Sequence, residues 1–233
     1  AYLIGIPEVW GYPASLGLYR VTADGVERLA ADLDRSFGVG FQAGLIYRAM
    51  EHLRVGLSYT SPQWFQDFDF NAVYENPSLP DFQTPRSISF AMDVPAVYAG
   101  GVAVDVGRFL WTGDVRYIGY SSTDGFSESG MDATGAIQGF GWDDIWVLAS
   151  GLQFRPVAPL ALRGGYNYTQ NPIPAEQSAA NVPAPAIVQH HLTLGLGYRF
   201  GDLAVDAAYY RAFENELTGP MVTPSGTINV TNR

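Results

Sequence analysis

The sequence predicts an all-β protein, a transmembrane antiparallel up-and-down β-barrel with about eight strands in this chain. Three observations predict it: apolar and polar residues alternate with period two, short turns alternate with long loops, and the composition leaves much apolar surface. Of the 233 residues only 15% are charged, whereas 14% are aromatic. No stretch approaches the roughly 18 uninterrupted apolar residues of a spanning helix, so strands are expected to meet the lipid.

The charge balance and the absence of cysteine exclude several classes of protein. Thirteen basic against 23 acidic residues give a net charge of −10, which argues against a nucleic-acid binder with a basic stripe. A chain with no cysteine has no disulfide, thiolate zinc site or cysteine nucleophile. The sequence begins without the charged and apolar regions of a signal peptide, so we expect any leader to be cleaved or to lie outside it.

Eight runs of alternation define the predicted strands. The longest, Arg86–Val106, keeps one parity through Pro95, so we expect a single strand with a bend or bulge at the proline. The runs cover residues 37–48, 53–60, 86–106, 109–121, 143–154, 160–170, 187–200 and 203–214.

Register across the short turns offers an independent check, because paired strands must put their apolar faces on the same side. Two-residue turns pair Val106 with Phe109 and Phe200 with Leu203, and the link at residues 155–159 would oppose Phe154 to Leu160. One face is then apolar, with Ser150, His190 and Arg211 as the polar exceptions. The other face holds Arg48, Arg54, Asp105, Asp114, Arg116, Arg163, Asn167, His191, Arg199 and Asp206. Apolar outside and polar inside is the inverse of a soluble barrel.

The chain divides into three predicted regions. Residues 1–35 form an extracellular loop region with a short amphipathic helix within residues 22–35, residues 36–214 form the barrel strands, and residues 215–233 form a loop that leads to a missing last strand. Long connections at about 67–85, 122–141 and 171–186 are expected outside the cell, and the short turns in the periplasm.

An outer-membrane hydrolase is one alternative, because Ser150, His191 and Asp143 or Asp144 supply the residue types of a catalytic triad. Strand parity points Ser150 and His191 to opposite faces, and the adjacent His190 and His191 cannot share a metal ion for the same reason. We therefore expect no enzyme, catalytic residue, metal or cofactor. A structural or adhesive barrel with a packed interior is the second alternative.

Apolar side chains in the loops and on the inward face are candidates for binding a hydrophobic ligand, although ordinary loop packing explains the loop residues equally well. The candidates are Trp64, Phe65, Phe68, Phe70, Val97, Leu110, Ile118, Phe126, Ile137 and Phe140. The inward charges are expected to form a lumenal polar network, with direct substrate contact as the alternative; its members are Asp105, Asp114, Arg116, Arg163, His191 and Arg199.

An ordered set of short motifs resembles the FadL/TodX family of outer-membrane transporters for long-chain fatty acids and aromatic hydrocarbons. The set is Asp93-Val94-Pro95, Gly113-Asp114-Val115-Arg116-Tyr117, Gly141-Trp142-Asp143-Asp144, Leu162-Arg163-Gly164-Gly165-Tyr166-Asn167-Tyr168, Asn171-Pro172, Pro183-Ala184-Pro185 and His191-Leu192-Thr193-Leu194-Gly195. It covers about residues 36–220, and no single piece is specific by itself.

The resemblance implies a 14-stranded barrel with a small hatch in its lumen, in the bacterial outer membrane. It implies passive transport of hydrophobic compounds: external loops capture an apolar ligand, which passes through the lumen and leaves sideways through the wall. Outer-membrane lipid and lipopolysaccharide are the expected surroundings, and a monomer the expected state. This chain is shorter than such a protein and lacks the hatch signature, so we expect a fragment without the early strands, the hatch and the last strand.

Overall fold

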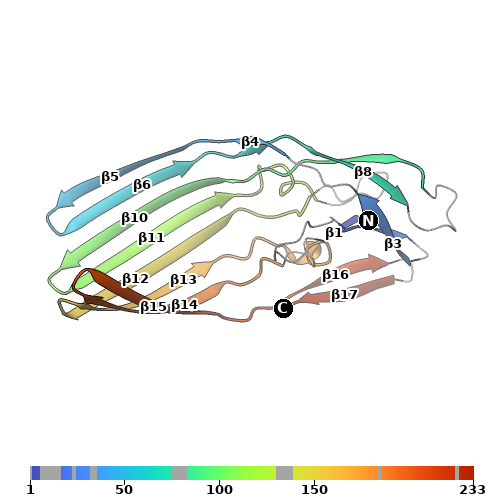
Figure 1. Ribbon diagram of the computed structural model, residues 1–233. Helices are drawn as coiled ribbons and strands as arrows, with labels where there is room; N and C mark the ends of the chain where they lie inside the picture. Colours follow the sequence, from blue (N-terminus) through green and yellow to red (C-terminus); the bar gives the residue numbers. More distant parts are fainter. Residues whose placement is uncertain are drawn as a thin grey trace.

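The computed structural model describes residues 2–5, 17–22, 25–31, 36–74, 83–129, 139–182, 185–223 and 226–233. In these residues the chain consists almost wholly of antiparallel strands (Figure 1). The helical element of the described part is one 3₁₀ turn, η1 (Ala175–Gln177). No helix in that part is long and apolar enough to cross a membrane.

The main sheet has eight strands in the order β15-β14-β13-β12-β11-β10-β6-β5. They are β5 (Gln42–Met50), β6 (Leu53–Thr60), β10 (Ala96–Val106), β11 (Phe109–Gly119), β12 (Ile145–Val157), β13 (Leu160–Thr169), β14 (His190–Phe200) and β15 (Leu203–Ala212). Short turns gather at one end of this sheet and the long connections at the other (Figure 1). The predicted eight-stranded meander is confirmed. Among the described residues the sheet does not close, and β5 and β15 are its edges.

The register predicted from parity is confirmed at both two-residue turns. Val106 pairs with Phe109 and Phe200 with Leu203. The pairing of Phe154 with Leu160 is wrong: Phe154 lies opposite Leu162, and Val157 opposite Leu160. β12 runs on through a bulge at Phe154/Val157, which absorbs the extra residues and leaves the outward side of Phe154 unchanged.

The predicted single strand over residues 86–106 is also wrong, because the strand is interrupted before and at Pro95. The segment divides into β9 (Arg86–Phe90) and β10, which belong to different sheets. Between them Val94 makes one isolated bridge with Gln63. Proline has no N–H to donate to a neighbouring strand, so regular pairing stops at Pro95.

A five-stranded sheet, ordered β1-β2-β3-β8-β9, lies at the loop end. Its remaining members are β1 (Tyr2–Gly5), β2 (Gly17–Thr22), β3 (Gly25–Ala31) and β8 (Phe68–Tyr74). The helix predicted within residues 22–35 is wrong, because β2 and β3 pair there from Leu18↔Leu29 to Thr22↔Gly25. So short a helix has little stability of its own, whereas a strand gains hydrogen bonds from each neighbour.

The loop predicted at residues 215–233 is wrong as well. β16 (Leu217–Thr223) and β17 (Gly226–Asn232) form an antiparallel hairpin there. The threonine, valine and isoleucine residues of this segment favour strands, a preference that its Gly, Pro, Ser and Asn content obscured. A further short pair joins β4 (Gly38–Val39) to β7 (Trp64–Phe65).

The outward face of the main sheet is apolar, bulky and exposed. Trp111 is 42% exposed, Leu194 52% and Val205 52%, and their neighbours across the strands are of the same kind. The few buried apolar side chains among the described residues lie chiefly near the loop end or in the loops, among them Phe126, Ile173 and Ile187. So large a continuous apolar surface is not stable in water, and it suits contact with lipid acyl chains.

Aromatic rings border this apolar band at both ends. Towards the loops a row of rings crosses five strands or their ends, with centroids 4.8 to 6.3 Å apart: Phe41, Tyr59, Tyr98, Tyr117 and Trp146. Towards the short turns, Phe109 stacks on Phe154 at 4.7 Å. At about 3.3 Å per residue and a tilt of roughly 40°, the stretch from Phe109 to Tyr117 rises about 20 Å. The outward face thus has the two aromatic girdles of an outer-membrane barrel.

Candidate binding site at the loop end of the sheet

The irregular segment at residues 91–95 builds one wall of a pocket. Its Asp93 carboxylate accepts a hydrogen bond from the Phe65 N–H at 2.7 Å, and the Asp93 N–H donates to the Asp124 carbonyl at 3.0 Å. Gln63 and Val94 exchange two backbone hydrogen bonds. Because Asp93 is only 8% exposed, these bonds fix the segment between the loop after β6 and the loop after β11.

The pocket has a volume of about 280 Å³. Its lining is apolar except for Asp93 and the Tyr120 hydroxyl, and consists of Phe65, Phe68, Met92, Asp93, Val94, Pro95, Tyr120 and Phe126. Known pockets for drug-sized ligands begin at about 300 Å³. This pocket therefore suits a small apolar molecule.

Four aromatic side chains pack together at the pocket, and two of them, Tyr120 and Phe126, also line it. Phe126 contacts the rings of Tyr120, Phe140 and Trp142, with centroids 5.1, 5.7 and 5.0 Å away. Gly125 precedes it with φ +82°, and a side chain there would collide with the backbone of Ala91 and Met92. Burial raises the pKa of the Tyr120 phenol. We call these four residues, Tyr120, Phe126, Phe140 and Trp142, the aromatic cluster.

A fully buried asparagine ties the aromatic cluster to the next loop. Asn181 is 0% exposed; its side-chain oxygen accepts a hydrogen bond from Trp142 Nε1 at 2.6 Å. Its amide nitrogen donates to the carbonyls of Phe140 and Gln177, both at 2.9 Å. Every polar atom of this side chain is thus engaged, and the loop after β13 holds the loop after β11 in place.

Asp93, the acidic residue of the pocket lining, interacts electrostatically with other carboxylates in the neighbouring loops. Desolvation raises the pKa of Asp124, and the nearby carboxylates of Glu128, Asp93 and Asp67 raise it further. None of the residues that line the pocket is basic. A negatively charged ligand would meet repulsion here, whereas an uncharged one would not.

Asp144 anchors the loop end of β12. Burial acts to raise the pKa of Asp144, but hydrogen bonds from Tyr117 and Ser121 outweigh it and lower that pKa. The Tyr117 hydroxyl donates at 2.5 Å and the Ser121 N–H at 2.8 Å. Tyr117 belongs to the outward aromatic row, so this carboxylate joins the girdle to the loop above it.

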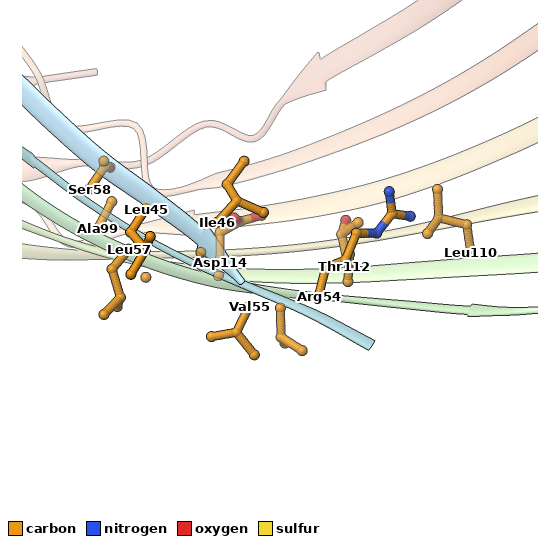
Figure 2. A pocket seen from close by; sticks show the side chains of 16 residues that line it. Leu45, Ile46, Arg54, Val55, Leu57, Ser58, Ala99, Leu110, Thr112 and Asp114 are labelled. Carbon is orange, nitrogen blue, oxygen red and sulfur yellow. The ribbon is translucent and has the colours of Figure 1, made fainter. Parts of the chain in front are cut away.

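The inward face carries two adjoining grooves. The larger, about 790 Å³, lies over β5, β6, β10 and β11, and the smaller, about 400 Å³, over β11 to β15; Leu110 and Thr112 line both. Figure 2 shows Ile46, Arg54 and Leu110 on one side of the sheet, with Val55 and Leu57 on the other. The grooves are deep because small residues lie on the inward face, such as Ala99, Gly101, Gly151 and Gly195.

The inward charges form separate pairs in the described part of the chain, rather than one continuous network. Arg163 Nη1 lies 2.7 Å from Asp206 Oδ1, and its Nε donates to Gln153 at 2.9 Å. Arg54 lies 3.9 Å from Asp105. Gly197 leaves the space that Arg163 and Asp206 occupy, since a side chain there would collide with both.

The other predicted lumenal residues lie apart from these pairs. The His191 ring stacks on Tyr210 at 5.4 Å and lies 3.3 Å from the Asn167 amide. Asp114 sits beside Gly101 in the larger groove, Arg116 lies opposite Ala99, and Arg199 opposite Ala204.

The structure brings together only some of the predicted ligand-binding residues. Phe65, Phe68 and Phe126 line the pocket, Phe140 backs it, and Leu110 lines both grooves. Trp64 pairs with Val39 outside the pocket lining, and Val97 faces Ile118 outside both grooves. Ile137 and the side chain of Phe70 lie outside the described residues. Met92 and Asn181 could not be predicted from the sequence, because their roles depend on contacts between loops.

The residues of the hydrolase alternative do not meet. Ser150 accepts a hydrogen bond from Trp111 Nε1 at 3.0 Å on the outward face, whereas His191 contacts Tyr210 on the inward face. The hydroxyl of Ser150 is thereby satisfied at a position that faces lipid. This pair therefore provides no nucleophile and base.

Two aromatic girdles, an apolar outward band and a polar inward face define the class: an outer-membrane β-barrel. The family model of the outer membrane protein transport proteins (OMPP1/FadL/TodX) matches residues 9–221. The chain belongs to this family, and its location is the outer membrane. No curated protein matches the chain by sequence.

Solved structures support the same fold. A FadL homologue from Pseudomonas aeruginosa has a TM-score of 0.65 at 20% identity, over 97% of this chain and 53% of that one. The toluene transporter TodX of P. putida has a TM-score of 0.57 at 16% identity, over 88% and 51%. The CymD monoaromatic hydrocarbon channel has a TM-score of 0.55 at 22% identity, over 81% and 52%. The chain thus spans about half the length of these proteins.

Proposed function

We propose that the protein is a passive outer-membrane channel for hydrophobic molecules, and that the pocket beside the aromatic cluster is where the molecule first binds. The observation that carries this proposal is the apolar pocket at the loop end, above a sheet whose inward face is grooved. An apolar molecule crosses the polar outer leaflet more easily when it exchanges one apolar surface for another. Leu110, on the wall shared by both grooves, is a candidate contact further along the path.

The preferred ligand is small and uncharged. The pocket volume of about 280 Å³ favours a ligand with one aromatic ring, and CymD, which has a similar fold, is a monoaromatic hydrocarbon channel. A fatty acid would bring its carboxylate towards Asp93 and the electrostatically coupled Asp124. With no basic side chain in the lining, nothing offsets that repulsion.

A matched pair of ligands tests this proposal. We expect toluene to bind to the protein in outer-membrane vesicles with at least tenfold higher affinity than benzenesulfonate, which keeps its charge at every pH used. Phe126→Ala should weaken toluene binding and uptake about tenfold, because the ring lining is lost. Trp64→Ala, a change in an aromatic residue outside the pocket lining, should leave both unchanged.

The ratio of toluene affinity to benzenesulfonate affinity should depend on pH. Because the pKa of Asp124 is raised, lowering the pH protonates it earlier than an ordinary aspartate and relieves its repulsion of anions. Benzenesulfonate affinity should rise as the pH falls, Asp124→Asn should produce the same rise at neutral pH, and toluene affinity should stay constant. Equal affinity for both ligands at neutral pH, or unchanged toluene uptake in Phe126→Ala, would contradict the proposal.

A further inference from the structure

On the outward face of the main sheet, one permanently charged side chain lies far from the short turns, at the loop end. It is Arg211, the second-last residue of β15, which pairs with Leu192 and shares its side of the sheet with Tyr209 and Val205. A charge on the lipid face costs about 2–4 kcal/mol at the bilayer centre but almost nothing at the interface. Since β15 begins beside the short turn Gly201-Asp202, Arg211 lies at its loop end, at the level of outer-leaflet headgroups.

The side chain of Arg211 rests on an aromatic ring. Its guanidinium carbon lies 5.3 Å from the centre of the Phe213 ring, close enough for a cation–π contact that holds its plane. In the parts of the chain that the structure describes, no carboxylate forms an ion pair with it. Its hydrogen-bond donors are therefore held in place and available.

Further donors lie on the same face. The Phe213 N–H bonds to the His190 carbonyl at 2.9 Å, which places His190 on the neighbouring strand β14. His190 Nδ1 lies 2.6 Å from the Tyr166 hydroxyl, and its ring centroid lies 5.2 Å from that of Tyr168. We call these five residues, Arg211, Phe213, His190, Tyr166 and Tyr168, the Arg211 patch.

We propose that the Arg211 patch binds a phosphate group of lipopolysaccharide in the outer leaflet. A guanidinium offers parallel N–H donors that match two phosphate oxygens, and the imidazole can add another donor. Charge complementarity supports this occupant, because the chain carries a net charge of −10 while this part of its lipid face presents a cation alone. The same position would be unfavourable for Asp or Glu.

Bound lipid can be counted directly. The protein is extracted from outer membranes in mild detergent, and native mass spectrometry measures retained lipopolysaccharide. We expect Arg211→Ala to retain at least tenfold less, as for loss of a charge-assisted hydrogen-bond pair, and Arg211→Lys to be intermediate. Arg116→Ala, which removes an inward cation opposite Ala99, should match the unaltered protein.

A second arm identifies the chemical group. Purified protein is titrated with bisphosphorylated lipid A, with dephosphorylated lipid A and with inorganic phosphate alone. We expect the phosphorylated lipid to bind at least tenfold more tightly than the dephosphorylated one. Equal affinity for the two lipids, equal affinity for inorganic phosphate, or full retention of lipid by Arg211→Ala would each overturn the proposal.

Discussion

Leu194→Arg should destabilise the membrane-inserted protein by about 2–4 kcal/mol, the cost of an arginine on the lipid face near the bilayer centre. Leu194 lies midway along β14 and is 52% exposed on the outward face. Neither of its partners across the strands, Gly164 and Tyr209, supplies a counter-charge. Urea unfolding in lipid vesicles measures the loss.

The adjacent residue provides the matched control. Thr193 has the inward parity of His191 and lies opposite Gly165, so Thr193→Arg places the same charge one residue away on the opposite face. It should cost less than about 1 kcal/mol, because the smaller inward groove admits water and already holds Arg163. Equal losses for the two variants, or a larger loss for Thr193→Arg, would refute the assignment of the faces.

Asn181→Leu should lower the free energy that holds the loops around the pocket in place by about 2–6 kcal/mol. The substitution nearly conserves volume but leaves Trp142 Nε1 and the Phe140 carbonyl without the partners they have now, and each buried unpaired group costs about 1–3 kcal/mol. Hydrogen exchange of residues 139–144 should accelerate accordingly. Toluene binding should weaken with it, since Trp142 packs against Phe126 in the aromatic cluster.

Val182→Ala is the control in the same loop, because Val182 is 49% exposed. It should change neither hydrogen exchange nor ligand binding. If hydrogen exchange becomes faster in Asn181→Leu while the toluene affinity is unchanged, then the order of these loops does not determine ligand binding. That result would show that the aromatic cluster does not shape the binding site.

Period-two alternation predicted the main sheet well because two different solvents select its faces. Lipid contact favours bulky apolar residues such as Trp111 and Leu194, whereas the interior accepts Asp114 and Arg163. The residue types that alternate along each strand therefore show which of its side chains face outward. The same rule predicted both two-residue turns. It placed the pairing of Phe154 wrongly, because a bulge changes register without changing the outward side.

The structure at the loop end depends on contacts between segments that are far apart in the sequence. The alternation of apolar and polar residues within one segment cannot predict such contacts. The dipeptide Asp24-Gly25 is a hairpin signal, but Val26, Leu29 and Ala30 also have helical spacing, which favours the helix predicted there. Of the pocket residues, the phenylalanines could be predicted from their place in long loops. Met92 could not, since its role follows from the interruption at Pro95, and Asn181 could not, since its partners lie about 40 residues away.

Side-chain direction along β14 is the most direct test of the whole account. Because the chain contains no cysteine, single cysteines can be introduced from Leu192 to Leu196 and labelled with a nitroxide in the membrane-embedded protein. Labels at 192, 194 and 196 should collide mainly with lipid-soluble oxygen, and those at 193 and 195 mainly with a water-soluble nickel complex. Uniform accessibility along the strand, or the opposite alternation, would contradict an outer-membrane barrel with a polar interior.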